Sequence, residues 1–494
     1  MSKEIKFLLG DERREIGTLD PTMTVLNYLR LVERRCGTKE GCAEGDCGAC
    51  TVVLGELEDD KVAYRAVNSC IQFMPTLDGK QLLTVEDLQS PDGSLHPAQQ
   101  AMVNNHGSQC GFCTPGFVMS LFALFHDGSN IDRQRIDDAL AGNLCRCTGY
   151  GPIIAAAEQM REEGPQDRFS KNGAAIAQAL RALQHKTMAE VAASDGRRYF
   201  APRKIDELAA MLLELPDAVL LAGGTDVGLW VTKQHRKLDP VIYLGEVAEL
   251  QRLSVGTSMV EIGAGVTYAR LLPLLASEYP DFGELLRRLG SSQIRACGTM
   301  GGNVANGSPI GDCPPALIAL DARLVLRRGA ERREIALEDF FIDYGKQDRR
   351  AGEFVETILL PRRDPARLFR CYKVSKRFDQ DITASLGAFN LKLEKGRVSD
   401  IRVCFGGMAA TPKRARHCEQ TVIGKPWTRE TVAGGQAALR QDYAPISDMR
   451  ASKTYRSLIA ENLLLKFFHE TGEPDTQTRP ETRIIAAATK AGHG

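Results

Sequence analysis

The sequence has no excess charge of either sign and no long hydrophobic run. Its 494 residues include 63 lysines and arginines against 63 aspartates and glutamates, so no basic field is available to attract nucleic acid or an anionic membrane. No run approaches the roughly 18 apolar residues of a membrane-spanning helix. The N-terminus carries charges at Lys3, Glu4 and Lys6 and has no apolar segment, so we expect no secretory signal and a cytoplasmic protein.

The sequence also lacks G-x-G-x-x-G, the glycine motif of Rossmann dinucleotide sites, which argues against a site of that type. No cysteine occurs from residue 148 to residue 296, whereas eight cysteines form two groups within the first third of the chain. This change of composition predicts a domain boundary. The length allows about two to four domains, each with its own core.

The first group of cysteines has the spacing C-x4-C-x2-C with a distant fourth member, as in plant-type [2Fe–2S] ferredoxins. It consists of Cys42, Cys47, Cys50 and Cys70. Gly41, Gly45 and Gly48 lie among these ligands and allow a tight loop that aims backbone N–H groups at a cluster. Because nothing indicates secretion, metal ligation is favoured over disulfides. A structural zinc site is the alternative, which the glycine-rich spacing disfavours.

The second group combines C-x2-C with a C-x-C. It consists of Cys110, Cys113, Cys145 and Cys147. Taken alone, this spacing is less distinctive, and zinc is a stronger alternative. Two four-thiolate groups in one chain nevertheless favour consecutive one-electron carriers, and so predict electron transfer. The other six cysteines have no cluster spacing and are expected to be small buried hydrophobes: Cys36, Cys297, Cys313, Cys371, Cys404 and Cys418.

Hydrophobic periodicity predicts a small domain around the first cysteine group. We expect strands over 3–9, 14–19 and 51–54, and a helix that begins at Val25. The order strand, strand, helix, cluster loop and strand suits a β-grasp domain that ends near residue 85.

The pattern becomes helical around the second cysteine group, from about 96 to 162. Thr114 is expected to be a helix N-cap with Pro115 at the first helical position, and Pro152 is expected to open another helix. The polar, alanine-rich stretch 163–197 is expected to be an interdomain linker with some helix.

Two glycine-rich segments later in the chain are candidates for binding a phosphorylated cofactor. The strand-like stretch 218–222 leads into Gly223-Gly224-Thr225-Asp226, although an ordinary turn is the better interpretation of this segment alone. The second segment, Cys297–Asp312, places five glycines among small hydrogen-bonding residues, which suits a cradle for a polar cofactor. The alternative is a simple glycine-rich loop.

At this point a resemblance to a known family becomes clear. The stretches GCAEGDCGAC, QCGFCTPG and NLCRCTGYGPI resemble the two-cluster region of the molybdenum hydroxylases, the xanthine dehydrogenase family. LLAGGTDV and GTMGGNVANGSPIGD resemble the FAD-binding domain of that family and of the carbon monoxide dehydrogenase flavoprotein subunit. The resemblance implies two [2Fe–2S] clusters held by the two cysteine groups, the second nearer the molybdenum. It also implies that Gln109 approaches the molybdopterin cofactor.

By position, the resemblance assigns FAD contacts to both glycine-rich segments and to a few later residues. They are Leu220, Leu221, Ala222, Gly223, Gly224, Thr225, Asp226, Val227, Leu289, Thr299, Gly302, Asn303, Asn306, Ser308, Asp312, Val355 and Lys373. Leu289 stands where many relatives place a phenylalanine against the flavin, which leaves the stacking partner open. The charged segment 373–381 resembles a family loop beside the flavin, with a solvated surface as the alternative.

The implied fold class is a multidomain α+β protein. Its expected parts are a ferredoxin-like β-grasp domain over 1–85, an all-helical [2Fe–2S] domain over 86–162, a linker over 163–197, a non-Rossmann α+β FAD-binding domain over 198–366, an α/β flavoprotein C-terminal domain over 367–475 and a tail over 476–494.

The implied function is electron transfer for a reaction that starts on another subunit. The resemblance points to the small subunit of a bacterial-type xanthine dehydrogenase, in which electrons from purine hydroxylation at molybdopterin on a large partner subunit pass through the clusters to FAD and then NAD+. A heterotetramer of two small and two large subunits is expected, with no catalytic acid or base in this chain. The alternatives are the equivalent subunit of an aldehyde or N-heterocycle hydroxylase, and a stand-alone electron carrier or diaphorase.

Overall fold

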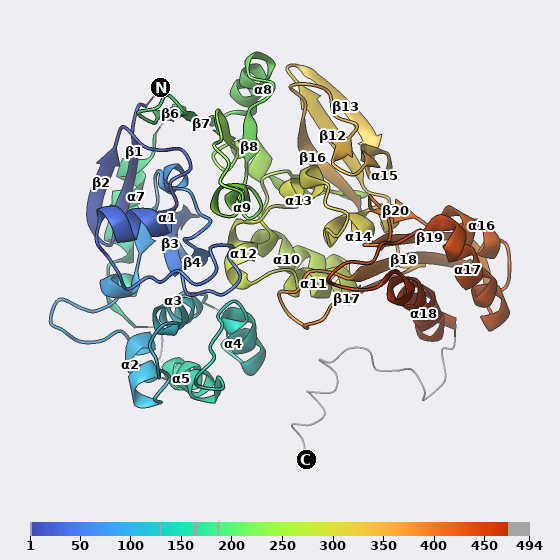
Figure 1. The fold of residues 1–494 in the computed structure, drawn as a ribbon, viewed down its shortest axis with the longest axis horizontal. Helices are drawn as coiled ribbons and strands as arrows, with labels where there is room; N and C mark the ends of the chain where they lie inside the picture. The colour runs from blue at the N-terminus through green and yellow to red at the C-terminus, as the bar shows by residue number, and fades with distance from the viewer. Residues whose placement is uncertain (1, 129, 163–165, 186, 473–494) are drawn as a thin grey trace.

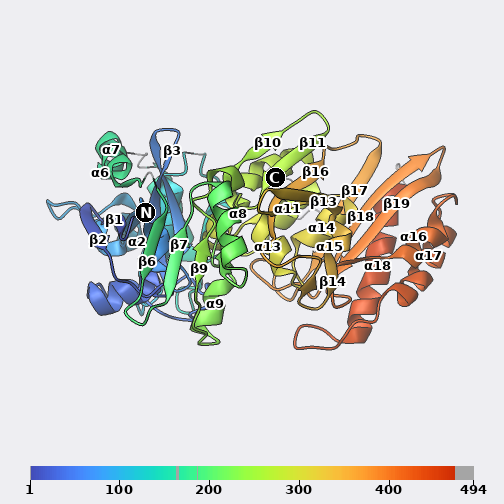
Figure 2. The same ribbon diagram turned by 90° about the horizontal axis from the view of Figure 1, so that it is seen from above.

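The computed structural model describes residues 2–128, 130–162, 166–185 and 187–472, and the expected tail over 476–494 lies outside them. The chain runs from an N-terminal sheet with a helical domain beside it, through a central α+β region, to a C-terminal sheet flanked by helices (Figure 1). A second view shows the same order along one long axis (Figure 2). No helix in these described ranges is long and apolar enough to cross a membrane.

The N-terminal sheet has the order β2-β1-β5-β3-β4, in which β1 and β5 are parallel neighbours. Its strands are β1 (Ile5–Leu9), β2 (Glu12–Ile16), β3 (Thr51–Glu58), β4 (Lys61–Asn68) and β5 (Gln81–Leu83). The second strand begins earlier than the expected 14–19, because the turn at Gly10, whose φ is +61°, pairs Leu9 with Glu12. The helix expected at Val25 is short: α1 (Val25–Asn27) continues as a π-helical turn (Tyr28–Val32).

The helical domain packs directly against this sheet. Its helices are α2 (Pro97–Asn104), α3 (Thr114–Phe125), α4 (Arg133–Leu140) and α5 (Gly151–Glu162). Helix α3 is buried on nearly all sides, and its Phe117 and Phe122 share one hydrophobic core with Leu8, Val53 and Leu83 of the sheet. The cap of α3 is Cys113 rather than the expected Thr114, because Thr114 is already helical and its hydroxyl donates to Ser108 Oγ at 2.7 Å.

The stretch 163–197, expected to be a linker, contains packed structure in its described part. Helices α6 (Arg168–Lys171) and α7 (Gly173–Leu183) lie in it, and Phe169 and Leu180 are buried in the core shared by the sheet and the helical domain. Strand β6 (Ala189–Ala192) then joins the next sheet. The apolar spacing along α7 gives one buried face, which explains why this segment packs instead of forming a free connection.

The central region contains two sheets and a layer of helices between them. The first sheet has the order β6-β7-β9-β8 and the second the order β10-β11-β16-β12-β13, with a separate hairpin of β14 and β15. Its strands after β6 are β7 (Arg198–Ala201), β8 (Val219–Leu221), β9 (Val241–Tyr243), β10 (Leu253–Val255), β11 (Met259–Gly263), β12 (Arg323–Arg328), β13 (Glu331–Ala336), β14 (Phe341–Asp343), β15 (Lys346–Gln347) and β16 (Phe354–Pro361). Its helices are α8 (Ile205–Glu214), α9 (Val227–Thr232), α10 (Tyr268–Glu278), α11 (Pro280–Arg287), α12 (Ser292–Cys297), α13 (Met300–Asn306), α14 (Cys313–Ala319) and α15 (Leu337–Phe340).

The C-terminal region is an antiparallel sheet in the order β17-β18-β19-β20, covered on one side by helices. Its strands are β17 (Arg367–Val374), β18 (Ser385–Glu394), β19 (Arg397–Gly406) and β20 (Lys413–Arg414), and its helices are α16 (Arg416–Val422), α17 (Arg429–Asp442) and α18 (Lys453–Gly472). The stacked rings of Phe389 and Phe467, 5.0 Å apart, join the sheet to α18.

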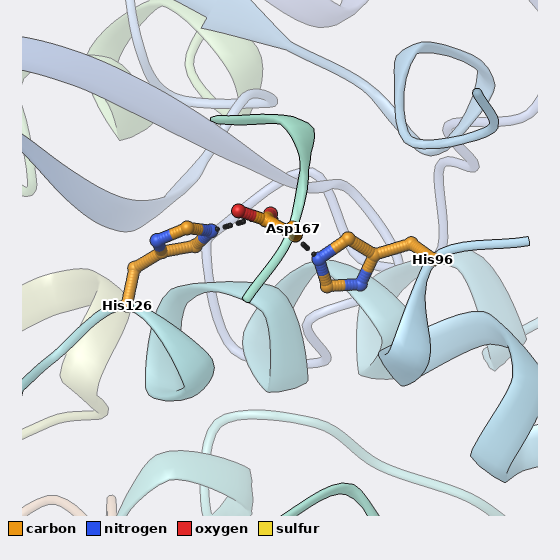
Figure 3. Close-up of side chains that lie close together, drawn as sticks. All are labelled: His96, His126 and Asp167. Carbon is orange, nitrogen blue, oxygen red and sulfur yellow. Dashed lines mark hydrogen bonds and ion pairs between the residues drawn. The ribbon is translucent and has the colours of Figure 1, made fainter. Parts of the chain in front are cut away.

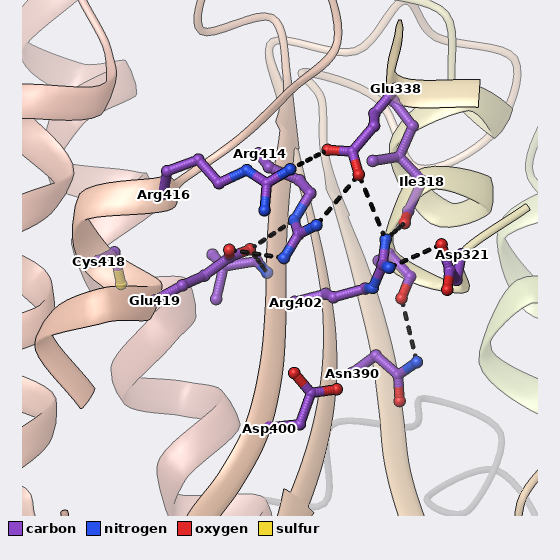
Figure 4. A network of polar contacts seen from close by, with 12 residues as sticks. Ile318, Asp321, Glu338, Asn390, Asp400, Arg402, Arg414, Arg416, Cys418 and Glu419 are labelled. Carbon is purple, nitrogen blue, oxygen red and sulfur yellow. Dashed lines mark hydrogen bonds and ion pairs between the residues drawn. The ribbon is translucent and has the colours of Figure 1, made fainter. Parts of the chain in front are cut away.

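Ion pairs attach the C-terminal region to the central one (Figure 4). Glu338 on α15 accepts hydrogen bonds from Arg414 at 3.1 Å and Arg416 at 2.8 Å, and Arg402 lies 3.6 Å from it. Arg402 also pairs with Asp321 at 2.6 Å. A network of this kind, with each guanidinium already partnered, fixes the angle between the two regions.

Candidate iron–sulfur and flavin sites

The first cysteine group converges in a loop that lies on the N-terminal sheet. Cys50 and Cys70 are buried, whereas Cys42 and Cys47 are partly exposed. The four thiols are in mutual hydrogen-bonding contact, with Cys42 touching Cys47 and Cys70, and Cys70 touching Cys50. The loop can close this tightly because Gly45 and Gly48 adopt φ values of +80° and +69°.

Backbone N–H groups already point at this group, since the amide of Asp46 donates to Cys42 Sγ at 3.4 Å. Four thiols with a backbone donor are the ligand set of a [2Fe–2S] cluster, so the residues present fit that group. When bound, it supplies one-electron redox chemistry, and this chain holds it and tunes its potential.

The second cysteine group lies at helix ends in the helical domain. Cys110 and Cys113 precede α3, while Cys145 and Cys147 lie between α4 and α5, and hydrogen-bonding contacts link Cys110 with Cys147 and Cys113 with Cys145. Cys110 and Cys147 are exposed, as is Gln109. Burial raises the pKa of the Cys113 thiol to about 12, so metal binding at neutral pH must displace its proton. The four thiols again fit a [2Fe–2S] cluster, and one side of this site faces solvent.

Of the remaining six cysteines, all expected to be buried, three are buried, two are partly exposed and one is exposed. Cys313, Cys404 and Cys418 are buried, and Cys297 and Cys371 are intermediate. Cys36 is exposed, so the expectation that it is buried is wrong. It follows the end of the π-helical turn, whose last residues, Leu31 and Val32, are exposed as well.

The two glycine-rich segments line one cavity of about 490 Å³. Twelve of the expected FAD contacts border it: Leu220, Ala222, Gly223, Gly224, Thr225, Asp226, Val227, Thr299, Gly302, Asn303, Asn306 and Val355. The segments meet without side chains between them, because a methyl group at Gly223 would lie 2.0 Å from the carbonyl oxygen of Cys297. The expected contacts therefore form one site, although they are up to 135 residues apart, from Leu220 to Val355.

The cavity has the donors and acceptors that a phosphorylated cofactor needs. Thr299 caps α13 by accepting a hydrogen bond from the Gly302 amide at 2.9 Å, and the first turn of that helix lines the cavity. Asn303 Oδ1 is buried and has no hydrogen-bond partner among the described residues. An unpartnered amide oxygen in a roomy cavity fits a bound polar ligand, so the site is compatible with FAD.

Five expected contacts do not border this cavity. They are Leu221, Leu289, Ser308, Asp312 and Lys373. Leu221 points into the core, and Lys373 pairs with Asp312 at 2.6 Å while both side chains are buried. Thr383 donates to the other oxygen of Asp312. This buried pair joins β17 of the C-terminal region to Asp312, the last residue of the second glycine-rich segment. Other residues of that segment line the cavity.

Sequence reasoning missed several residues of the cavity. Trp230 and Tyr268 add aromatic surface, and Gln347 and Arg349 enter from the hairpin of β14 and β15. Trp230 follows the glycine turn by four residues and is one of only two tryptophans, a signal that could have been used. Nothing in the local sequence around Arg349 indicates a cofactor site, because the fold alone brings that hairpin to the cavity.

His96, His126 and Asp167 form a cluster whose ligand atoms lie within 4.8 Å of one another (Figure 3). Both imidazoles bond the same oxygen, Asp167 Oδ2, through their Nε2 atoms at 3.0 and 2.9 Å. The backbone amide of Ala98 donates to Nδ1 of His96, so the proton of that ring is on Nε2. Because this proton occupies the nitrogen that faces Asp167, His96 offers no lone pair to a metal there, and the cluster is a hydrogen-bonded clamp.

The clamp holds helix α6 against the helical domain, and its loss is expected to weaken the N-terminal half. Burial opposes ionisation of Asp167, but the hydrogen bonds from His126 and His96 outweigh it and keep its pKa well below the ordinary value. We expect Asp167→Asn to lower the free energy of unfolding by about 1–3 kcal/mol at pH 7.5, since it leaves buried donors unsatisfied. Urea unfolding of the N-terminal half measures this, with the exposed Asp92→Asn as the control.

The pH dependence of the same clamp has a definite sign. Burial lowers the pKa of His96, so below about pH 6.5 the unfolded chain takes up a proton that the folded chain does not. Stability at this site is therefore full above about pH 6.5 and falls as the pH drops through the lowered folded pKa. A rise in melting temperature on adding zinc that Asp167→Asn abolishes would contradict the hydrogen-bonded clamp.

Three family models match the chain in the order of its domains. Residues 84–158 match the [2Fe-2S] binding domain, 191–363 the FAD binding domain in molybdopterin dehydrogenase, and 370–471 the CO dehydrogenase flavoprotein C-terminal domain. The chain corresponds to the iron–sulfur and flavin portion of the molybdenum hydroxylases. This supports the predicted multidomain α+β class with a [2Fe–2S] binding domain, an FAD-binding domain and a flavoprotein C-terminal domain.

Curated proteins with similar sequences are much longer than this chain. The chain is 31% identical to xanthine dehydrogenase 1 of Arabidopsis thaliana over 90% of its own length and 38% of the relative. It is 29% identical to xanthine dehydrogenase of Emericella nidulans over 94% of its length and 38% of the relative. The chain therefore spans less than two fifths of these relatives.

Solved structures match the flavin half. Carbon monoxide dehydrogenase from Hydrogenophaga pseudoflava superposes with a TM-score of 0.52 at 27% identity, covering 54% of this chain and 93% of that one. The similarity supports the flavoprotein fold of this part of the iron–sulfur and flavin portion.

Proposed function

We propose that this chain is the iron–sulfur and FAD subunit of a xanthine dehydrogenase and carries electrons from a molybdopterin-bearing partner subunit to NAD+. The proposal assigns one [2Fe–2S] cluster to each cysteine group and FAD to the cavity of the glycine-rich segments. The observation that carries it is the spatial order of the three sites, which begins at the surface and ends at the cavity.

The second cysteine group is where electrons from the partner would enter this chain. Cys110 and Cys147 are exposed, and the neighbouring Phe112, 46% exposed, and Leu144, 43% exposed, give this surface an apolar character. A partner can therefore approach the ligands themselves. This arrangement supports electron entry here, with Gln109 on the same exposed loop.

The first cysteine group lies between the second group and the flavin cavity. On one side, the Leu144 amide, adjacent to Cys145, donates to the carbonyl of Cys47 at 3.0 Å. On the other side, Ile71, adjacent to Cys70, packs against the flavin segment so closely that a methyl group at Gly224 would lie 3.3 Å from its carbonyl oxygen. Each ligand loop thus touches the next site.

Hydrogen bonds hold α9, which follows the glycine turn, against the first cysteine loop. Thr232 donates to the carbonyl of Ala43 at 2.7 Å, and Lys233 to that of Cys42 at 2.5 Å. The chain's contribution is to fix three cofactor sites at short, constant separations. The similarity to xanthine dehydrogenases supports purines as the partner's substrate, and a complex of two small and two large subunits rests on the same resemblance.

Anaerobic reduction of the purified native complex tests the proposal. Xanthine is expected to bleach the [2Fe–2S] and flavin absorption bands, and NAD+ to restore them. Bleaching by an aldehyde or an N-heterocycle but not by xanthine would assign the chain to another molybdenum hydroxylase. A chain that purifies without a molybdenum-containing partner and is reduced by NADH alone would establish the stand-alone carrier instead.

A further inference from the structure

A buried polar network lies where the N-terminal sheet, the helical domain and the central region meet. Its centre is Gln293 on α12, which is 1% exposed. Its amide nitrogen lies 3.2 Å from Thr51 Oγ1, 3.2 Å from Ser120 Oγ and 3.1 Å from Asn143 Oδ1. Thr51 begins β3, Ser120 is on α3 and Asn143 precedes the Cys145 loop, so one side chain contacts all three parts of the molecule.

Asn143 joins the two cysteine loops to each other. It is 2% exposed, and its Nδ2 donates to the carbonyl of Gly48 at 3.1 Å. Gly48 lies between Cys47 and Cys50, while Asn143 is two residues before Cys145. Ser120 donates to Asn143 Oδ1 at 2.7 Å and so orients its amide. Together with the bond from Leu144 to Cys47, this gives two direct hydrogen bonds between the loops.

The network lies in the contact between the N-terminal sheet, the helical domain and α12, which we call the seam. The backbones in this seam are packed too closely to shift. A methyl group at Gly48 would lie 2.2 Å from the carbonyl oxygen of Gly142, and one at Gly116 would lie 2.2 Å from that of Gly48. A methyl group at Gly142 would lie 2.0 Å from Gln293 Oε1. Apolar contacts tolerate sliding, but directional hydrogen bonds inside such close backbone packing select one relative position.

We propose that Asn143 and Gln293 are positioning residues for electron transfer. Asn143 sets the separation of the two iron–sulfur sites, and Gln293 sets the position of that pair relative to the flavin cavity. The inference rests on the proposed function, since it takes the two cysteine groups as cluster sites. Because electron-transfer rates fall steeply with distance, a seam that fixes distance also fixes the rate.

The division of labour follows from which bonds each residue makes. Without Gln293, the bonds among Ser120, Asn143 and Gly48 remain, so the two cysteine loops stay together while α12 loses its bonds to Thr51, Ser120 and Asn143. Without Asn143, the side-chain bond to Gly48 and one acceptor of Gln293 are lost, and only the backbone bond from Leu144 to Cys47 still joins the loops. The two substitutions should therefore affect different transfer steps.

The experiment compares Asn143→Ala and Gln293→Met in the native complex. After chemical reduction of both clusters, electron paramagnetic resonance reports their magnetic interaction, which falls with the cube of the distance between them. We expect Asn143→Ala to weaken this splitting and slow transfer between the clusters. Gln293→Met should leave the splitting unchanged and slow the reoxidation of both clusters by NAD+. Iron and flavin content should be retained in both variants.

The matched control is Asn390→Ala, which removes another buried asparagine with a backbone hydrogen bond, to Ala319 at 3.0 Å, far from the seam. It should lower stability without changing the splitting or the NAD+ rate.

If Asn143→Ala does not load iron, Asn143→Ser is the variant that tests the inference. Serine is smaller than asparagine, so it loses the bond to Gly48, but unlike alanine it keeps a polar group in the network. Unchanged splitting in an iron-loaded Asn143 variant, or an unchanged NAD+ rate in Gln293→Met, overturns the inference. Zinc in place of about four irons in the wild type would instead overturn the proposed function.

Discussion

Replacing Cys113 by serine is expected to abolish electron delivery from the partner's substrate while NADH-driven dye reduction continues. In the proposed function this thiol is a ligand at the site that faces the partner, whereas the flavin cavity and the first cysteine group lie beyond it. Changes behind a metal ligand already reduce metal affinity or activity by roughly 10–100-fold, so the loss of a ligand should exceed this range. Xanthine-driven and NADH-driven dye reduction, measured on the same preparation, separate the two steps.

Cys418→Ser is the control for that experiment. Cys418 is a buried thiol on α16, so its replacement perturbs folding without touching either cysteine group or the cavity. Both activities per folded molecule should stay at the wild-type level. An equal fall of both activities in well-folded Cys113→Ser would mean that electrons do not enter through the second group.

Gly223→Ala is expected to empty the flavin site. The new methyl group would lie 2.0 Å from the carbonyl oxygen, 2.4 Å from the carbonyl carbon of Cys297 and 2.8 Å from the amide nitrogen of Gly298. All three atoms are backbone, so the two glycine-rich segments must separate, and overpacking of this kind costs about 1–3 kcal/mol. The flavin absorbance per protein and the melting temperature of the purified complex measure the effect.

Gly434→Ala provides the matched substitution. Gly434 is inside helix α17, and its methyl group would meet only Thr421 Cγ2 at 3.4 Å, an ordinary contact. Flavin content should be unchanged and stability should rise by about 0.4–1 kcal/mol, because alanine restricts the unfolded chain. Full flavin occupancy in Gly223→Ala would show that the cofactor does not lie between these segments.

Most of the candidate site residues were predicted from short motifs, in which cysteines or glycines lie a few residues apart. The cysteine groups are readable because each ligand loop is a short, glycine-rich segment, and the structure brings both sets of four thiols together. The flavin segments are also local, and twelve expected contacts line one cavity. The number of clusters and the ligand assignments stay predictions that iron analysis can test.

The sequence did not predict which segments far apart in the chain come together in the fold. Arg349 and Gln347 reach the cavity from a hairpin whose own residues have no cofactor pattern. Asp312 and Lys373 pair with each other instead of lining the cavity, a choice that depends on where β17 docks. The apolar pattern after Thr114 predicted the helix that became α3, but the stretch that contains α7 was expected to be a linker, and its burial in one common core with α3 was not predicted.

That common core has a consequence for synthesis on the ribosome. Leu8, Val53 and Leu83 of the sheet complete their packing only when α3, α5 and α7 have been made, so about 183 residues must emerge before the core closes. Until then the first cysteine loop sits on a half-covered sheet. We therefore expect both cysteine groups to become structured together, as one nascent folding unit, before the second glycine-rich segment of the flavin cavity has emerged.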